Sequence, residues 1–186
     1  MSAISAQYAR RLRPHKRRLG RRWHVDEVFI RIQGTTHYLW RAVDQNGEIV
    51  DILVQARRDR AAAERFFQHL LQRTDIVPHT VVTDRLRSYS AAIPRVLPGI
   101  RHKRGHWLNN RAENSHQPTR ERERRMRRFK SPQQAQRFLS IHGAVSSHFR
   151  PRRHRLTAVR YRAVRRQRFR MWNPAVRAAA LELAPR

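Results

Sequence analysis

The chain has 186 residues, with 42 Lys and Arg against 13 Asp and Glu, and its formal charge of +29 points to nucleic acid as the leading class of partner. It contains no cysteine, which excludes a disulfide scaffold, a Cys-ligated zinc or iron–sulfur site and a Cys nucleophile. Apolar stretches are only a few residues long and no secretory signal is visible, so we expect a cytoplasmic, nucleoid-associated protein with no membrane partner.

The charge is distributed unevenly along the chain. Residues 1–22 carry 8 basic and no acidic residues, residues 23–113 have a net charge of +4 and hold 10 of the 13 acids, and residues 114–186 have a net charge of +17. We therefore expect a basic N-terminal arm over 1–22, a folded core over 23–150 and a basic helical extension over 151–186. The acids of the nearly neutral middle are where a metal site could be built.

Hydrophobic periodicity predicts three consecutive antiparallel strands over residues 23–33, 36–43 and 48–55. Gly34-Thr35 forms the first turn, and Asn46-Gly47 ends a second turn, because this dipeptide tolerates positive φ.

The rest of the chain predicts alternating helices and strands. Asp59 can N-cap a helix that ends near Arg73. We then expect a strand over 79–83, a helix over 88–97 that Pro94 disturbs, and a strand over 100–103. Three further helices are expected over 108–128, from Ser131-Pro132 onward, and over 156–172. This order predicts an α/β fold with a mixed five-stranded sheet flanked by helices.

Three acidic residues are candidate metal ligands. Asp26 lies on a strand face with Val28, Ile30 and Ile32, Asp84 ends the strand Thr80–Thr83, and Glu113 lies in a basic helical segment. An Asp, Asp and Glu triad can bind two Mg²⁺ ions for phosphodiester chemistry. The alternatives are a salt bridge from Asp26 to a nearby Arg, a helix cap by Asp84, and a surface pair between Glu113 and Arg120.

Four motifs resemble the integrase-type core of bacterial insertion-sequence transposases. They are Trp23-His24-Val25-Asp26-Glu27-Val28, the segment Tyr38–Asp44, the segment Thr83–Tyr89 and the segment Leu108–His116. Together the motifs are similar to insertion-sequence family six, a group of DDE transposases, over about Arg22 to Trp172. The resemblance implies an RNase H-like fold, with Asp26, Asp84 and Glu113 as the catalytic, metal-binding triad and two Mg²⁺ (or Mn²⁺) ions as cofactors.

The same resemblance implies double-stranded DNA, both transposon ends and target, as the partner of a homo-oligomer. It carries over a DNA contact for Arg120, and His116 lies one helical turn after Glu113. The candidate DNA-binding residues are Arg85, Asn109, Asn110, His116, Arg120, Arg124, Arg125, Arg128 and Lys130. Trp107 is the best candidate for base stacking, whereas Trp23, Trp40 and Phe66 are expected in the core.

The resemblance implies cutting of transposon DNA ends and joining of the 3′-OH to target DNA by in-line transfer. A non-enzymatic nucleic-acid-binding protein, including an inactive transposase remnant, is the alternative, and an RNase H-like nuclease is a weaker one. The family also has a helix-turn-helix region before its core. The 22 residues before Trp23 are too few for that region, so we expect the chain to lack it.

Overall fold

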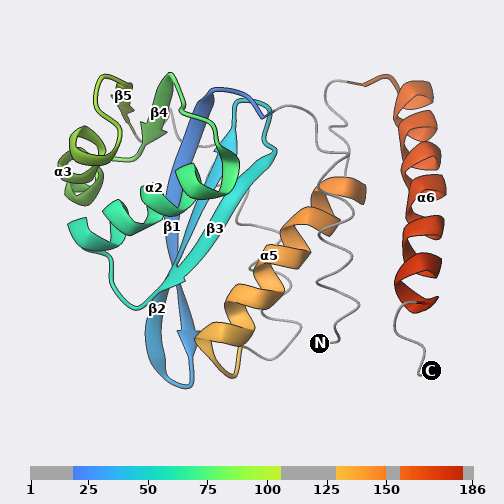
Figure 1. Cartoon of the computed structure of the whole chain (residues 1–186), viewed down its shortest axis with the longest axis horizontal. Helices are drawn as coiled ribbons and strands as arrows, with labels where there is room; N and C mark the ends of the chain where they lie inside the picture. The colour runs from blue at the N-terminus through green and yellow to red at the C-terminus, as the bar shows by residue number, and fades with distance from the viewer. Residues whose placement is uncertain (1–18, 106–128, 150–155, 182–186) are drawn as a thin grey trace. The chain divides into compact units, whose positions relative to one another are not determined.

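The computed structural model describes residues 19–105, 129–149 and 156–181, and Figure 1 labels their helices and strands. The chain divides into two compact units, one comprising Arg18–Arg137 and the other including Phe138–Arg186. The predicted boundaries at residues 22 and 150 remain predictions.

The first unit is built on a five-stranded sheet with the order β3-β2-β1-β4-β5. Strands β1 (Arg22–Ile32), β2 (Thr35–Asp44) and β3 (Ile49–Gln55) are consecutive and antiparallel. Strands β4 (Thr80–Thr83) and β5 (Arg101–Arg104) add parallel to β1 on its other side. The predicted mixed five-stranded sheet, with three antiparallel strands followed by two parallel ones, is confirmed.

The two hairpin turns define the antiparallel half of the sheet. The first turn lies at Gln33 and Gly34, which both have positive φ, so the predicted turn at Gly34-Thr35 is one residue too late. The type of turn explains the shift, because two consecutive residues of positive φ match the twist of a two-residue hairpin. In the second turn the Gly47 amide donates to the Asp44 carbonyl at 2.8 Å, and Gly47 adopts the predicted positive φ.

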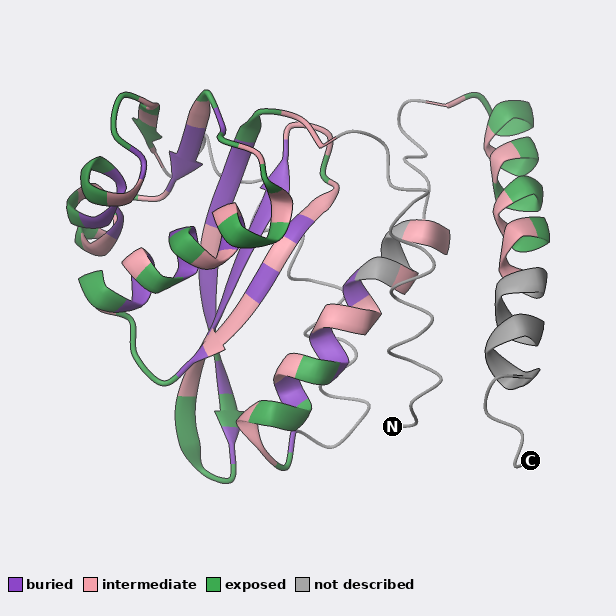
Figure 2. Cartoon of the chain, in the orientation of Figure 1, coloured by how far each residue is buried: buried purple, intermediate pink, exposed green. Residues whose placement is uncertain are grey.

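One face of the sheet is covered by α2 (Arg60–Thr74) and α3 (Arg87–Val96). As predicted, the Asp59 side chain caps α2, accepting a hydrogen bond from the Ala62 amide at 2.8 Å. Trp23 and Trp40 are fully buried with Phe66 in this core, which confirms their expected positions. Figure 2 shows the resulting stripe of buried residues along α2.

The outer edge of β3 is closed by one side chain. Gln136 accepts a hydrogen bond from the Val54 amide at 2.7 Å and donates to the Ile52 carbonyl at 3.2 Å. The side-chain amide thus takes the place of a neighbouring strand and covers edge groups that could otherwise pair with another chain. At the opposite edge, β5 consists of Arg101, His102, Lys103 and Arg104, a charged strand that discourages such pairing.

Two helices complete the described chain, α5 (Pro132–Phe149) and α6 (Ala158–Leu181). The Ser131 hydroxyl accepts from the Gln134 amide at 3.1 Å, so α5 begins where predicted. In contrast, α6 continues nine residues beyond the predicted end at Trp172. Pro174 lies inside α6, so this proline does not end the helix.

The described helices include none that is both long and apolar enough to cross a membrane. The predicted helix over 108–128 lies outside the described residues.

Asp44 is fully buried, and we expect its side chain to contribute strongly to the stability of the fold. Its carboxylate accepts from the backbone amides of Gly20 at 2.9 Å, Asn46 at 2.7 Å and Glu48 at 2.9 Å. Asp44→Ala should lower the free energy of unfolding by about 2–4 kcal/mol, because it leaves these donors without their acceptor. Urea denaturation measures the change.

The matched control is Asp75→Asn, at the exposed left-handed position that ends α2. Because Asn also tolerates this conformation, this variant should stay within about 0.5 kcal/mol of wild type. Equal stabilities for the two variants would contradict the role assigned to Asp44.

Candidate active site

The candidate site lies where β4 ends beside the middle of β1, its parallel neighbour. In the register of β1 and β4, Trp23 is opposite Val81 and His24 is opposite Val82. Continued by two residues, this register brings Asp26 beside Asp84, which follows β4 directly. Since neighbouring strands lie about 4.8 Å apart, carboxylates at equivalent positions can reach one ion.

Three carboxylates meet at this point. Asp26, Glu27 and Asp84 each offer an oxygen atom, and these atoms all lie within 4.8 Å of one another. Asp26 and Asp84 are partly exposed, whereas Glu27 is buried. No second group of three metal-ligand side chains this close is found in the part of the chain that the structure describes. The structure therefore brings two of the three predicted triad residues together, while their catalytic role remains a prediction.

A backbone amide holds the side chain of Asp84 in place. One oxygen of Asp84 accepts a hydrogen bond from the Leu86 amide at 2.9 Å, just before α3 begins. This is the cap-like contact raised as the alternative for Asp84, and it leaves the second oxygen of the carboxylate for another partner. Asp26 is the register partner of Arg41 on β2. Arg41 is buried, and burial lowers its pKa to about 10, so it is still positively charged at neutral pH.

Glu27 has a different environment from the two aspartates. One of its oxygens lies 2.6 Å from the Arg58 Nε, and the other accepts the hydroxyl of Tyr89. Burial raises the pKa of Glu27; the Tyr89 hydrogen bond opposes the rise, the Asp84 carboxylate adds to it, and Arg58 opposes it. Both oxygens therefore already have strong partners, which distinguishes Glu27 from a carboxylate available to a metal ion.

Tyr89 holds this arrangement from α3. Its side chain is fully buried, and burial with the neighbouring Glu27 carboxylate raises its pKa well above the usual range, so the hydroxyl keeps its proton and donates. Its ring packs edge-on against Trp40 at 5.5 Å and Phe67 at 6.2 Å between centroids. The core that covers the sheet thus also positions the carboxylate beside Asp26.

The remaining predicted site residues fall into two groups. Arg85 and Lys130 are exposed, as a contact with DNA requires. Outside the described residues lie Glu113, Trp107 and the DNA-binding candidates Asn109, Asn110, His116, Arg120, Arg124, Arg125 and Arg128.

The sequence-based prediction missed Glu27, Arg58 and Arg41. Because side chains alternate along a strand, Glu27 shares a face with Trp23 and Val25. An acid on that apolar face was the sequence feature that could have identified it. Arg41 offered a similar signal, because it lies in a strand between Trp40 and Ala42. Arg58 stands among exposed loop arginines, and nothing in the sequence sets it apart.

In the C-terminal unit, α6 exposes a dense row of arginines. Arg160, Arg162, Arg165, Arg166 and Arg170 are exposed, and no residue from Leu156 to Trp172 is buried. The Arg165 guanidinium lies 5.9 Å from the Tyr161 ring centroid and 5.8 Å from that of Phe169. The surface is therefore basic with interleaved aromatic rings, a pattern typical of nucleic-acid contacts.

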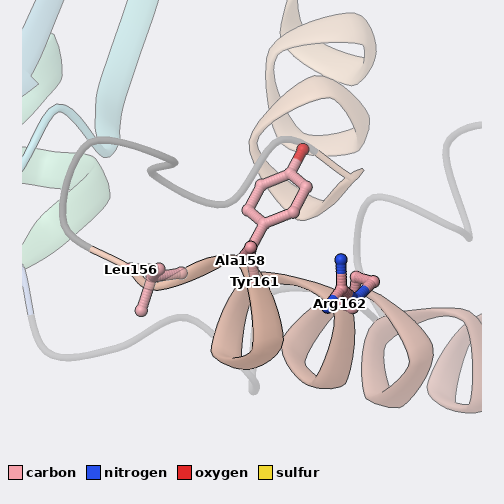
Figure 3. A pocket seen from close by; sticks show the side chains of 4 residues that line it. All are labelled: Leu156, Ala158, Tyr161 and Arg162. Atoms are coloured by element: carbon pink, nitrogen blue, oxygen red, sulfur yellow. The ribbon is translucent and has the colours of Figure 1, made fainter.

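A cavity of about 360 Å³ lies at the start of this helix. Leu156, Ala158, Tyr161 and Arg162 line it, and the Tyr161 ring projects from the helix (Figure 3). No carboxylate is among these lining residues, so the cavity is chemically unlike the acidic cluster.

Comparison of solved structures gives neighbours among retroviral integrase cores. The catalytic core of HTLV-2 integrase with magnesium is 13% identical with a TM-score of 0.49, over 70% of this chain and 86% of that one. The core of BIV integrase is 16% identical with a TM-score of 0.48, over 72% of this chain and 86% of that one.

Among curated proteins, the Staphylococcus aureus transposases of insertion sequence-like element IS431mec and of IS257 in transposon Tn4003 are each 32% identical over 100 residues. These matches cover 51% of this chain and 44% of each relative, so the chain spans less than half of their length. A Yersinia pseudotuberculosis protein, pYV0051, is 31% identical over 77 residues, which cover 40% of this chain and 72% of that protein.

A family model described as a DDE domain, that of IS240-type transposases, matches residues 20–152. The match contains the whole sheet and both aspartates of the acidic cluster. The chain therefore belongs to the DDE domain family of insertion-sequence transposases, as the four motifs had indicated.

Proposed function

We propose that this chain acts as a DDE transposase, which cuts DNA at transposon ends and joins the freed 3′-OH to target DNA. The observation that carries the proposal is the convergence of Asp26, inside β1, and Asp84, directly after the parallel strand β4, with carboxylate oxygens within 4.8 Å. Membership of the DDE domain family supports the same chemistry.

The donor set fits Mg²⁺ or Mn²⁺. Both ions prefer carboxylate oxygen, and Asp26 and Asp84 supply such oxygens at a partly exposed position. We propose that Glu113 completes the set and that the site takes two ions. When bound, such ions activate the attacking oxygen and stabilise the leaving oxygen of a phosphodiester.

The protein's own residues orient this reaction. Asp26 is fixed within a central strand, and Asp84 is fixed by the Leu86 amide, so the two carboxylates need little reorganisation. In cutting, a water oxygen bonds to phosphorus as the bond to the 3′ oxygen breaks. In joining, the freed 3′-OH bonds to a target phosphorus as the target's own 3′ oxygen leaves. Each step exchanges one P–O bond for another and requires no redox partner.

Double-stranded DNA is the proposed partner, bound by a homo-oligomer. Arg85 directly follows Asp84 and is exposed, so it can reach a phosphate near the acidic cluster. The exposed arginines of α6 supply further sequence-independent contacts. This basic helix also supports the alternative function, a nucleic-acid-binding protein without catalysis.

Mutation of Asp84 separates chemistry from binding. In Mg²⁺ or Mn²⁺ the wild type should nick or join pre-processed DNA ends, and Asp84→Asn should lower that rate by at least about 100-fold without weakening DNA binding. Asn can still accept from the Leu86 amide but lacks the negative charge that holds the metal. Gel assays of strand joining and fluorescence anisotropy measure the two quantities.

Asp75→Asn makes the same chemical change at the exposed end of α2 and should keep wild-type rates. Activity of Asp84→Asn at the wild-type rate, or activity that persists in EDTA, would overturn the proposal. A wild type that binds DNA but neither nicks nor joins it in either metal would favour the non-enzymatic alternative.

If the arginines of α6 contact DNA, removing them should reduce the salt dependence of DNA binding. Arg162→Ala combined with Arg166→Ala should reduce the slope of log K against log salt by up to about 0.9 for each DNA phosphate that the variant no longer neutralises. Arg60→Ala is the control, because Arg60 is exposed but paired with Glu64 at 3.5 Å. An unchanged slope in the double variant, measured by anisotropy between low and physiological salt, would remove α6 from the DNA interface.

A further inference from the structure

Arg58 lies in the loop between β3 and α2, beside the acidic cluster. Its Nε contacts one oxygen of Glu27 at 2.6 Å, and the Arg58 side chain is 40% exposed while that of Glu27 is 2% exposed. The guanidinium is therefore held by a buried carboxylate on one edge and open to solvent on another.

The loop itself is fixed close to the site. The Ser88 hydroxyl on α3 donates to the Arg58 carbonyl at 3.1 Å, and Asp59, the next residue, caps α2. The partner carboxylate, Glu27, lies with Asp26 and Asp84 in the 4.8 Å cluster. Only one carboxylate thus separates the cation from the two aspartates.

A purely structural reading is that Arg58 neutralises Glu27, because a buried carboxylate needs a counter-charge. That reading accounts for the Nε contact. It does not account for the exposure of Arg58, whose side chain is 40% open to solvent although its partner carboxylate is buried. A planar guanidinium that is partly open to solvent can offer two parallel N–H groups to a phosphate.

We propose that Arg58 binds a DNA backbone phosphate next to the scissile one, with Glu27 and Tyr89 holding its guanidinium in place. The inference rests on the proposed function, since it takes DNA as the substrate of this site. Fixing the side chain before DNA arrives reduces the entropy lost on binding. Glu27 and Tyr89 are then positioning residues, and Arg58 is the group that touches the substrate.

The absence of cysteine from the natural chain allows a direct test by disulfide capture. Arg58→Cys and Arg57→Cys are each mixed with a short blunt duplex that carries a thiol tether on one backbone phosphate, in buffer with Ca²⁺. Arg57 is the matched control: it is the preceding residue, its side chain is 80% exposed, and it lies 4.0 Å from Asp59.

Capture by Arg58→Cys should exceed capture by Arg57→Cys at least about 5-fold, and should be concentrated on tethers at the first few phosphates from the 3′-OH end. Equal capture by the two variants, or equal capture at terminal and central tethers, would overturn the proposal. Repeating both in a Glu27→Gln background keeps the test valid if loss of Arg58 alone impairs folding, because no unpaired buried charge then remains.

A binding measurement separates the two roles of Arg58. Arg58→Ala should weaken binding of the same duplex by about 3- to 10-fold, and this loss should persist in the Glu27→Gln background. If Arg58 only neutralises Glu27, the loss should disappear in that background, which would overturn the proposal.

A different result would contradict the proposed function, namely a wild type that shows no metal-dependent nicking or joining of DNA. Capture and binding in Ca²⁺ require no turnover, so they test Arg58 in either case.

Discussion

Three carboxylates within 4.8 Å of one another impose the main constraint on this molecule. Like charges at that distance repel strongly at the edge of a protein core, so each needs a compensating partner. Glu27 forms an ion pair with Arg58 and accepts a hydrogen bond from Tyr89, and Asp84 accepts one from the Leu86 amide. Asp26 lies opposite the buried Arg41 in the register of β1 and β2. Glu27, with two strong partners, is buried, whereas Asp26 and Asp84 stay partly exposed.

The fold supplies these partners from separate parts of the chain. Parallel pairing of β1 with β4 determines the distance between the aspartates, and α3 brings Tyr89 across the core to Glu27. Packing of Tyr89 against Trp40 and Phe67 means that core and site share the same side chains. A substitution in the core beneath α3 should therefore change the position of the Glu27 carboxylate.

Much of the sheet was predictable because its signals are local. Alternation of apolar residues, the Asn46-Gly47 turn and the Asp59 cap each depend on a few neighbouring residues, and the structure confirms all three. Asp26 was identifiable as an acid on an apolar strand face. The roles of Glu27 and Arg58 were not predictable, because their contacts join residues 31 to 62 positions apart. The last nine residues of α6, beyond Trp172, were not predicted.

We propose that Asp26 and Asp84, with Glu113, hold the metal ions of a strand-transfer site. The most direct measurement is anomalous X-ray diffraction from crystals of the full chain grown with Mn²⁺ and a DNA end. We expect an anomalous peak about 2.0–2.3 Å from oxygens of both aspartates, with Glu113 in the same coordination shell and Glu27 still bound to Arg58. Mn²⁺ bound elsewhere, or a site that excludes Asp84 or Glu113, would contradict it.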